Sequence, residues 1–281
     1  MKVNIAKSAG FCFGVKRALS IAFQTAQSAS PVYMIGDIVH NEDVIKKLKR
    51  RGVKKVRYLK KGGKKILLVR AHGISQGILK KARQLGYTIV DATCPMVKEI
   101  HRIVKESERK NRKIIIIGDK KHDEVQGIIG QLKTKPIVVD NIENIPLATV
   151  RGIKNACVVA QSTQNGDMVL EIVGILRRYI KKLFFFNTIC RPTQIKQEEI
   201  KKMPLENDVM IIIGSKTSAN TKRLYEISKF INSRSYWVNS KKEIKPIWLK
   251  EAKRIGVTAG ASTPEYIIED IIKYLKQAGR N

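Results

Sequence analysis

The sequence lacks the long apolar run that a transmembrane helix requires. Its longest apolar runs, such as residues 114–117, have the length of a strand, whereas a bilayer-spanning helix needs about 18 residues or more. The first twenty residues contain Lys2, Lys7, Lys16 and Arg17 with no continuous apolar block between them. We therefore expect neither a membrane span nor a signal peptide, and we expect the protein to be cytoplasmic.

Cysteine is scarce: the 281 residues include four cysteines, too few and too widely spaced for a disulfide framework. No CxxC pair occurs, which argues against finger-type and ribbon-type zinc sites, and the CxxxCxxC spacing of radical enzymes is also absent. No GxGxxG motif follows a predicted strand, so a nicotinamide cofactor is not indicated. In a reducing compartment the thiols are therefore either buried fillers or reactive groups.

Acidic side chains are also few. Asp and Glu total 24 against 55 Lys and Arg, which gives a formal net charge of +31 and a pI of about 10.1. The basic residues occur as short pairs along nearly the whole chain and form no basic tail. This pattern fits a solvated basic surface, and it also fits attraction of anions such as phosphorylated substrates, acidic protein partners or nucleic acid.

What the sequence does contain is a repeated pattern: a short β-branched run, a polar loop and then a helical stretch. With 43% hydrophobic residues, the chain can bury real cores. The alternation predicts an α/β fold with parallel strands and right-handed crossovers. The predicted strands cover residues 3–6, 32–35, 65–70, 88–90, 113–117, 156–160, 183–186, 209–213 and 255–258.

Reactive residue types follow these predicted strands. In open α/β sheets, ligands bind outside the carboxyl ends of the strands, where helix N-termini also attract anions. We therefore expect one polar site assembled from many strand–helix loops. The loop residues are Cys12, His40, His72, Cys94, His122, Cys190, Ser218 and Ser262.

Two architectures fit this pattern. A (β/α)₈ barrel would place all the loops on one face, whereas several small α/β modules could point their strand ends at a common centre. Cys12 and Cys94 are 82 residues apart, and Cys94 and Cys190 are 96 residues apart. This spacing, about one cysteine per domain of common size, favours the modules.

Three cysteines, Cys12, Cys94 and Cys190, lie at or just before predicted helix starts, where a thiolate is stabilised. Each alone could be a small buried hydrophobe. Together, three thiolates suit zinc or an iron–sulfur cluster, and a four-iron cluster with three thiolates has one iron open to substrate. Cys157 differs because it lies inside a predicted apolar strand, where we expect a core residue.

Three of the four histidines, His40, His72 and His122, also lie in the loops. A lone loop histidine is usually structural, but three suggest ligands or hydrogen-bond donors to an anion. His101 lies within a predicted helix, where we expect its side chain either to pack against a neighbouring element or to lie on the surface. Glu124 lies two residues after His122, at a predicted helix start. It is either an acid that the helix dipole favours there or a proton carrier in the site.

Two loops have the layout of a phosphate cradle. GSKTSAN at 214–220 follows a buried predicted strand and opens a helix, and AGASTP at 259–264 repeats the arrangement. Neither has the spacing of a Walker motif, and either alone is an ordinary capping turn.

Six segments carry a resemblance to a known family: AGFCFGV at 9–15, HN at 40–41, AHG at 71–73, DATCP at 91–95, NTIC at 187–190 and TAGAS at 258–262. In this order they resemble 4-hydroxy-3-methylbut-2-enyl diphosphate reductases, the last enzymes of the methylerythritol phosphate route to isoprenoids. The resemblance runs from Gly10 to the C-terminal helix.

The resemblance implies three α/β domains with parallel sheets around a central iron–sulfur cluster. We place an N-terminal segment with the first cluster cysteine at 1–13, and domains at 14–95, 96–190 and 191–281. The resemblance implies one [4Fe–4S] cluster held by Cys12, Cys94 and Cys190 with one open iron, and Glu124 as the proton source. The substrate-binding residues that it implies are His40, His72, His122, Ser162, Thr163, Ser218, Asn220 and Ser262.

The implied reaction uses two electrons and two protons to remove the substrate's allylic hydroxyl as water, which gives isopentenyl and dimethylallyl diphosphate. A small acidic ferredoxin or flavodoxin is the expected electron donor, because a strongly basic protein can attract it. We expect a monomer with no membrane partner, and we do not expect nucleic acid as a partner.

The chain departs from the family pattern at four positions. Gln-Thr-Thr of the family appears as Gln-Ser-Thr, with Ser162 in the middle, and Asp123 stands where the family usually has Pro. Ala219 replaces a frequent Ser, and Lys196 stands where Arg is common. None of these changes removes a cluster ligand or the acid.

Two other functions remain open from the residues alone. A zinc hydrolase acting on a phosphorylated substrate would contain zinc and no sulfide. A basic nucleic-acid-binding module would bind any duplex in a salt-sensitive way.

Overall fold

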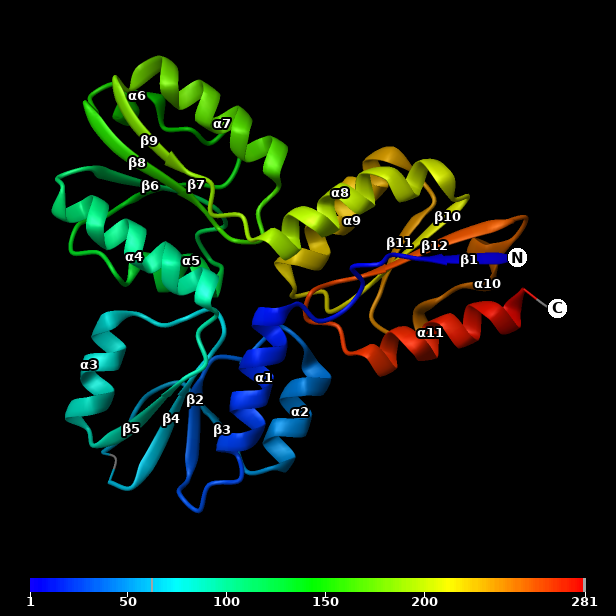
Figure 1. Cartoon of the computed structure of the whole chain (residues 1–281), viewed down its shortest axis with the longest axis horizontal. Helices are drawn as coiled ribbons and strands as arrows, with labels where there is room; N and C mark the ends of the chain where they lie inside the picture. The colour runs from blue at the N-terminus through cyan, green and yellow to red at the C-terminus, as the bar shows by residue number, and fades with distance from the viewer. Residues whose placement is uncertain (62, 280–281) are drawn as a thin grey trace. The chain divides into compact units, whose positions relative to one another are not determined.

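The computed structural model of the chain describes residues 1–61 and 63–279. These residues form three parallel four-stranded sheets with their helices (Figure 1). This confirms the predicted α/β fold, and the separate sheets agree with small modules and not with a single barrel. The chain groups into two compact units, which are described in turn.

The first unit comprises Met1–Val15, His40–Asp43 and the chain from Cys190 onward. Its parallel sheet has the order β1-β12-β10-β11, so the first strand of the chain completes a sheet made of the last three strands. The strands are β1 (Lys2–Ile5), β10 (Val209–Ile213), β11 (Ser235–Val238) and β12 (Arg254–Ala259). The helices are α8 (Arg191–Glu206), α9 (Ala219–Ile231), α10 (Pro246–Leu249) and α11 (Glu265–Ala278), with a 3₁₀ turn η1 (Lys241–Glu243).

The central strand β10 is buried on both faces. Ile211 and Ile213 pack with Ile271 of α11 on one face, and Met210 and Ile212 pack with side chains of α8 and α9 on the other. A parallel strand covered on both faces reads as a continuous apolar run, which is why the sequence at 209–213 shows no alternation.

The second unit comprises Lys16–Val39 and Val44–Ile189 and contains two sheets. Their orders are β3-β2-β4-β5 and β7-β6-β8-β9, and all pairings are parallel. The strands are β2 (Val32–Ile35), β3 (Lys54–Val56), β4 (Lys65–Val69), β5 (Tyr87–Asp91), β6 (Lys113–Ile117), β7 (Ile137–Val139), β8 (Asn155–Ala160) and β9 (Lys182–Phe186). The helices are α3 (Gln76–Gln84), α4 (Pro95–Arg109), α5 (Asp123–Ile129), α6 (Leu147–Val150) and α7 (Gly166–Tyr179). Helices α1 (Phe13–Thr25) and α2 (Glu42–Arg50) begin in the first unit and continue in the second.

The sheet around β6 has two hydrophobic cores, one on each face. Ile115 and Ile117 face α7, whereas Ile114 and Ile116 face α4 and α5. Cys157 of β8 belongs to the second core and is fully buried, as predicted for a core residue. Burial raises the pKa of the Cys157 thiol, so this cysteine is held as an unreactive thiol.

Each sheet also contains one edge strand that the sequence pattern does not predict: β3, β7 and β11. These strands have three or four residues each, so they are too short to show a period.

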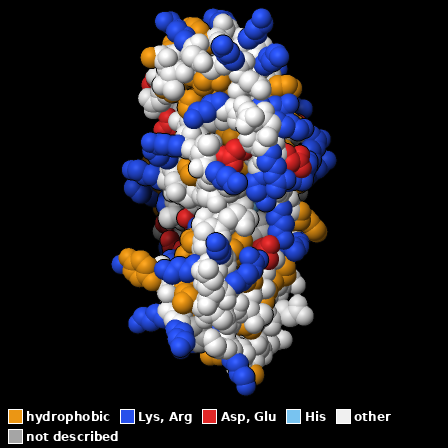
Figure 2. Space-filling view, turned by 90° about the vertical axis from the view of Figure 1, so that its left-hand side faces the viewer, with side chains coloured by type: hydrophobic (Ala, Val, Ile, Leu, Met, Phe, Trp, Pro, Cys, Tyr) orange, Lys and Arg blue, Asp and Glu red, His pale blue; other side chains and the backbone are white. Residues whose placement is uncertain are grey.

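Basic side chains are widely dispersed. Figure 2 shows Lys and Arg over all parts of the visible face, with few Asp and Glu among them. Some basic groups lie over aromatic rings, as Arg112 does over Phe184 at 3.5 Å from the ring centroid. Among the helices of residues 1–61 and 63–279, none is both long and apolar enough to cross a membrane.

Candidate active site

The predicted site residues all follow strands, and they fall into two groups. The first unit contains Cys12, His40, Cys190, Ser218, Asn220 and Ser262. The second unit contains His72, Cys94, His122, Glu124, Ser162 and Thr163. Because every sheet is parallel, the loops after its strands lie at one edge of that sheet. His40 and Cys190 are grouped with the first unit, although each follows a strand of the second unit, β2 and β9 respectively.

In the first unit, three of these loops follow neighbouring strands. Cys12 comes after β1, Ser262 after β12 and Ser218 after β10. The backbone N–H of Cys12 donates to the carbonyl of Ala261 at 3.3 Å, and the Ser262 hydroxyl donates to the carbonyl of His40 at 3.1 Å. These bonds hold the loops of Cys12, His40 and Ser262 against one another.

The run at 214–220 forms a capped helix start. Ser218 is the N-cap of α9, and its hydroxyl accepts a hydrogen bond from the N–H of Thr221 at 3.3 Å. Asn220 is 5% exposed, and neither its amide nitrogen nor its amide oxygen has a hydrogen-bond partner in the described part of the chain. A buried amide without partners is unfavourable, so Asn220 suits a polar ligand bound at this helix N-terminus.

The three loop cysteines share one local setting. Cys94 and Cys190 are the N-caps of α4 and α8, and Cys12 directly precedes α1. The N–H of Val15 donates to Cys12 Sγ at 3.4 Å, and Cys190 Sγ lies 3.1 Å from Thr193 Oγ1. Free N–H groups and the helix dipole favour the thiolate at such positions, so all three sulfurs are suited to binding a metal.

A buried lysine accompanies two of these cysteines. Lys196 of α8 is 2% exposed and lies in the electrostatic field of Cys12 and Cys190. Burial lowers its pKa to about 8, while negative charge on Cys12, Glu199 and Cys190 acts in the opposite direction. In the sequence, Lys196 stands out only because Arg is common at this position. Its burial could not be predicted, because lysine is normally exposed.

In the second unit, Glu124 is a buried acid held by one partner residue. It lies in the first turn of α5 and is 2% exposed. The backbone N–H of Ser162 donates to Glu124 Oε1 at 2.6 Å, and the Ser162 hydroxyl donates to Oε2 at 2.7 Å. Burial raises the pKa of Glu124, and the two hydrogen bonds from Ser162 oppose this effect. A carboxyl with a raised pKa is suited to donating a proton near neutral pH.

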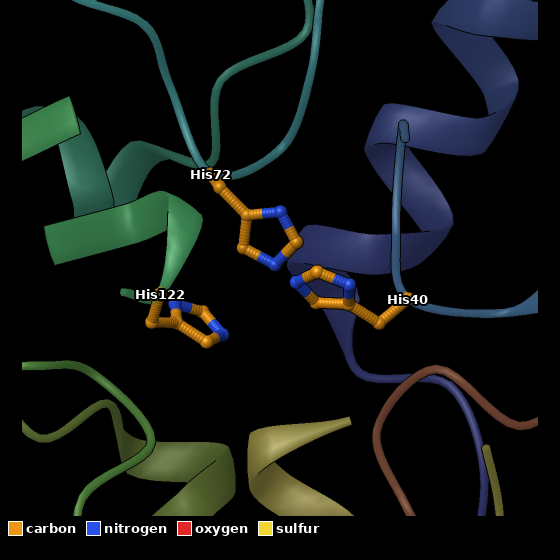
Figure 3. Close-up of side chains that lie close together, drawn as sticks. All are labelled: His40, His72 and His122. Carbon is orange, nitrogen blue, oxygen red and sulfur yellow. The ribbon is translucent and has the colours of Figure 1, made fainter. Parts of the chain in front are cut away.

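Two histidines lie beside this acid. His122 is the N-cap of α5, and its Nδ1 accepts the N–H of Glu124 at 3.1 Å. The ring of His72, from the loop after β4, meets the ring of His122 edge to face, with centroids 5.4 Å apart and planes at 89° (Figure 3). Because Nδ1 of His122 is an acceptor, Nε2 is the position that carries the proton in its neutral form.

Thr163 is connected to the same loop through Gln161. The Gln161 amide nitrogen donates to Thr163 Oγ1 at 3.1 Å, and its amide oxygen accepts the N–H of Asp119 at 3.1 Å. Gln161 is 2% exposed, so it fixes the loop after β8 to the loop after β6. The second unit therefore brings together His72, His122, Glu124 and Ser162, with Thr163 on the adjoining turn.

Two residues that sequence reasoning did not assign to the site support it. Arg70 forms an ion pair with Asp123, the residue between His122 and Glu124. His101 of α4 is buried, and a Cβ built on Gly73, the neighbour of His72, would lie 2.7 Å from His101 Cε1. The Asp in place of the family's Pro was the only signal in the sequence for the ion pair, and no motif pointed to the packing of His101 near Gly73.

Comparison with known proteins gives consistent relatives over nearly the whole chain. Residues 3–276 match the family model described as LytB protein. The chain is 41% identical to a 4-hydroxy-3-methylbut-2-enyl diphosphate reductase of Aquifex aeolicus, over 96% of this chain and 94% of that protein. It is 37% identical to a protein of the same description from Clostridioides difficile, over 98% of this chain and 99% of that protein.

Two solved structures have the same fold. The first is an (E)-4-hydroxy-3-methyl-but-2-enyl diphosphate reductase described as the terminal enzyme of the non-mevalonate pathway; it is 39% identical, with a TM-score of 0.71 over 99% of this chain and all of that chain. The second, an E-1-hydroxy-2-methyl-but-2-enyl-4-diphosphate reductase from Plasmodium falciparum, is 30% identical, with a TM-score of 0.89 over 97% of this chain and 87% of that chain.

Proposed function

The chain belongs to the LytB protein family, and we propose that it reduces 4-hydroxy-3-methylbut-2-enyl diphosphate to isopentenyl and dimethylallyl diphosphate. The reaction is a two-electron reductive dehydroxylation in the non-mevalonate route to isoprenoids. The observation that carries the proposal is the placement of the reactive side chains. Every one that the family motifs imply follows the carboxyl end of a parallel strand, as expected for ligand-binding loops.

We propose that Cys12, Cys94 and Cys190 hold one [4Fe–4S] cluster with one open iron. Their chemistry fits such a group, since each sulfur lies at a helix start where a thiolate is favoured. Cys157 does not fit, because it is enclosed in a hydrophobic core. When bound, the cluster would pass electrons from the external donor to the substrate and would offer a Lewis-acidic iron site.

The diphosphate is held by hydroxyl, amide and imidazole groups. In the first unit, Ser218 and Asn220 offer a helix N-terminus and a buried amide, and Ser262 and His40 lie in adjoining loops. In the second unit, His72 and His122 offer imidazole donors. Such groups donate hydrogen bonds to phosphate oxygens, and the dipole at a helix N-terminus also attracts the negative charge of the phosphate.

Glu124 supplies the proton. Burial raises its pKa, which favours the protonated carboxyl, and Ser162 fixes the orientation of both oxygens. The Ser162 hydroxyl and the neighbouring Thr163 hydroxyl orient the alcohol end of the substrate. Ser162 keeps the hydroxyl of the family's Thr but lacks its methyl group, so its side chain is less restricted.

Electrons come from a small acidic ferredoxin or flavodoxin. The net charge of +31 would accelerate the encounter with such a partner and make its rate sensitive to salt. The cytoplasmic location and the monomeric state remain predictions of the sequence.

Anaerobic reconstitution followed by iron, sulfide and zinc analysis and spin resonance tests the proposal. We expect about four irons and four sulfides per chain, a spectrum that changes when the diphosphate is added, and both alkene products under reducing conditions. Cys12→Ser should lose or damage the cluster, whereas Cys157→Ala should keep the iron content of the wild type. Zinc without sulfide would indicate a hydrolase, and iron loss in Cys157→Ala would show that the ligands are assigned wrongly.

A further inference from the structure

Helix α8 contains a buried cation that the proposed reaction does not use. Lys196 is 2% exposed, whereas Lys201 and Lys202 on the same helix are exposed. The Lys196 ammonium donates to the backbone carbonyls of Ser8 and Ala259, the latter at 3.1 Å. Burying an ammonium is unfavourable unless its hydrogen bonds and charge are satisfied, so this placement calls for a role beyond packing.

The same helix is hydrogen-bonded to the segment that precedes Cys12. The Glu199 carboxylate accepts hydrogen bonds from the N–H groups of Lys7 and Ser8, at 2.5 and 3.0 Å, and from the Ser8 hydroxyl at 2.5 Å. Lys196, on the same helix, binds the carbonyl of Ser8. Because Cys190 is the N-cap of α8, one helix fixes both the Cys190 thiol and the segment just before Cys12.

Lys196 is also electrostatically coupled to both thiols. Its ammonium binds the carbonyl of Ser8, four residues before Cys12, and negative charge on Cys12, Glu199 and Cys190 opposes the effect of burial on the pKa of Lys196. In a poorly hydrated interior a unit charge acts far more strongly on its neighbours than it does in water. A positive charge beside cluster-ligating thiolates favours the more negative, reduced form, because reduction adds an electron to the same region.

We propose that Lys196 is a positioning residue that holds the Cys12 segment against α8 and raises the reduction potential of the cluster that Cys12 and Cys190 help to bind. This inference rests on the proposed function, since it requires the cluster. It extends that function by naming the residue that adjusts how readily the cluster accepts electrons from the external donor.

The test compares Lys196→Gln with Lys196→Arg in the reconstituted full-length protein. Lys196→Gln removes the charge, Lys196→Arg keeps it, and Lys202→Gln is the control for removing an exposed charge from the same helix. The readouts are iron and sulfide content, thermal unfolding and a reductive titration followed by spin resonance. We expect Lys196→Gln to shift the reduction equilibrium toward the oxidised form by about tenfold, which is about 59 mV for one electron. Lys196→Arg should retain most of the wild-type value, and Lys202→Gln should equal it.

A second variant should shift the reduction potential in the opposite direction, and it remains informative if Lys196→Gln does not fold. Glu199→Gln removes a negative charge from the same group, so its cluster should be easier to reduce than that of the wild type, although its iron content should fall as the Ser8 segment loosens. A potential unchanged in both variants, or lowered equally by Lys202→Gln, overturns the inference. A wild-type protein that takes up no cluster overturns the proposed function instead, so the two failures are distinct.

Discussion

Arg70 Nη1 lies 2.5 Å from Asp123 Oδ2, and this ion pair joins the end of strand β4 to the first turn of helix α5. The Arg70 side chain is 11% exposed and that of Asp123 is 33% exposed, so the pair is largely shielded from water. Arg70 Nε also donates to the carbonyl of Gly73 at 3.4 Å. One guanidinium therefore couples the loop that carries His72 to the helix start that carries Glu124.

Removing this ion pair should lower both stability and turnover. Asp123→Asn should reduce the free energy of unfolding by roughly 1–3 kcal/mol, because it leaves a mostly buried guanidinium without its countercharge. It should also lower kcat, because Glu124 follows Asp123 directly. Urea titration and steady-state kinetics measure the two effects, with Asp167→Asn in the first turn of α7 as the control. The charge-swapped variant, Arg70→Asp with Asp123→Arg, should recover part of the loss, and no recovery would argue against coupling through this pair.

Glu124→Gln should separate binding from proton donation. The amide oxygen of Gln can still accept the N–H of Ser162, so the fold and the substrate affinity should remain close to those of the wild type. Turnover should fall by about 10²–10⁴-fold, the usual contribution of a general acid. Isothermal titration with the diphosphate and product analysis distinguish the two effects; near-normal turnover would remove Glu124 from this role.

The same residue predicts a pH dependence. Burial raises the pKa of Glu124, so the carboxyl keeps its proton to a higher pH than an exposed Glu does. The rate of the wild type should therefore decline as the pH rises through this raised pKa, because the proton donor is lost. Rate–pH profiles of the wild type and Glu124→Gln test this, and the variant's profile should lack the decline.

The α/β fold was predictable because its strands are covered on both faces. Continuous β-branched runs such as 113–117 and 209–213 are bounded by polar loops, and those bounds agree with β6 and β10. The reactive loops were predictable for the same reason, since chain order alone places them after strands. The edge strands β3 and β7 were missed because each has only three residues, and β11 was missed because its four residues do not form a continuous β-branched run.

The supporting contacts of the site were beyond sequence reasoning. Lys196 binds the carbonyl of Ser8, 188 positions away in the chain, and Arg70 pairs with Asp123 across two different sheets. Neither residue lies in a motif with a fixed spacing, and both types are normally exposed. Only the packing of the elements shows that their charges are buried and directed at the segments that carry Cys12 and Glu124.

Gly73 should tolerate no side chain. Its φ is +76°, and an added Cβ would lie 2.7 Å from Cε1 and 3.3 Å from Nε2 of His101. Gly73→Ala should therefore lower the free energy of unfolding by about 1–3 kcal/mol and weaken substrate binding through the displaced His72. Gly174→Ala is the matched control, because that position lies inside α7 with open space around it and should gain about 0.5–1 kcal/mol. Equal stabilities of the two variants in urea would contradict the close packing of His101 on Gly73.

His101 should make the protein less stable in acid. Its pKa is lowered to about 4, chiefly by burial, with Lys105 adding to the effect, whereas Asp91 opposes it. Because the folded state holds a proton less readily than the unfolded chain, whose histidine has its ordinary pKa of 6.5, stability is fully present above pH 6.5 and is lost as the pH falls toward 4. The loss attributable to His101 is roughly 3 kcal/mol over this interval.

Urea unfolding of the wild type and His101→Gln between pH 7 and pH 4 measures this loss, because the variant has no titrating group at position 101. His101→Gln should be less stable than the wild type at pH 7, since the ring no longer packs on Gly73. The difference should shrink as the pH falls, because only the wild type loses stability through this histidine. Lys105→Gln should give an intermediate slope, since removing that charge lets the pKa of His101 rise toward its ordinary value. Parallel curves for the wild type and His101→Gln would mean that His101 is already protonated in the folded protein or is not buried there.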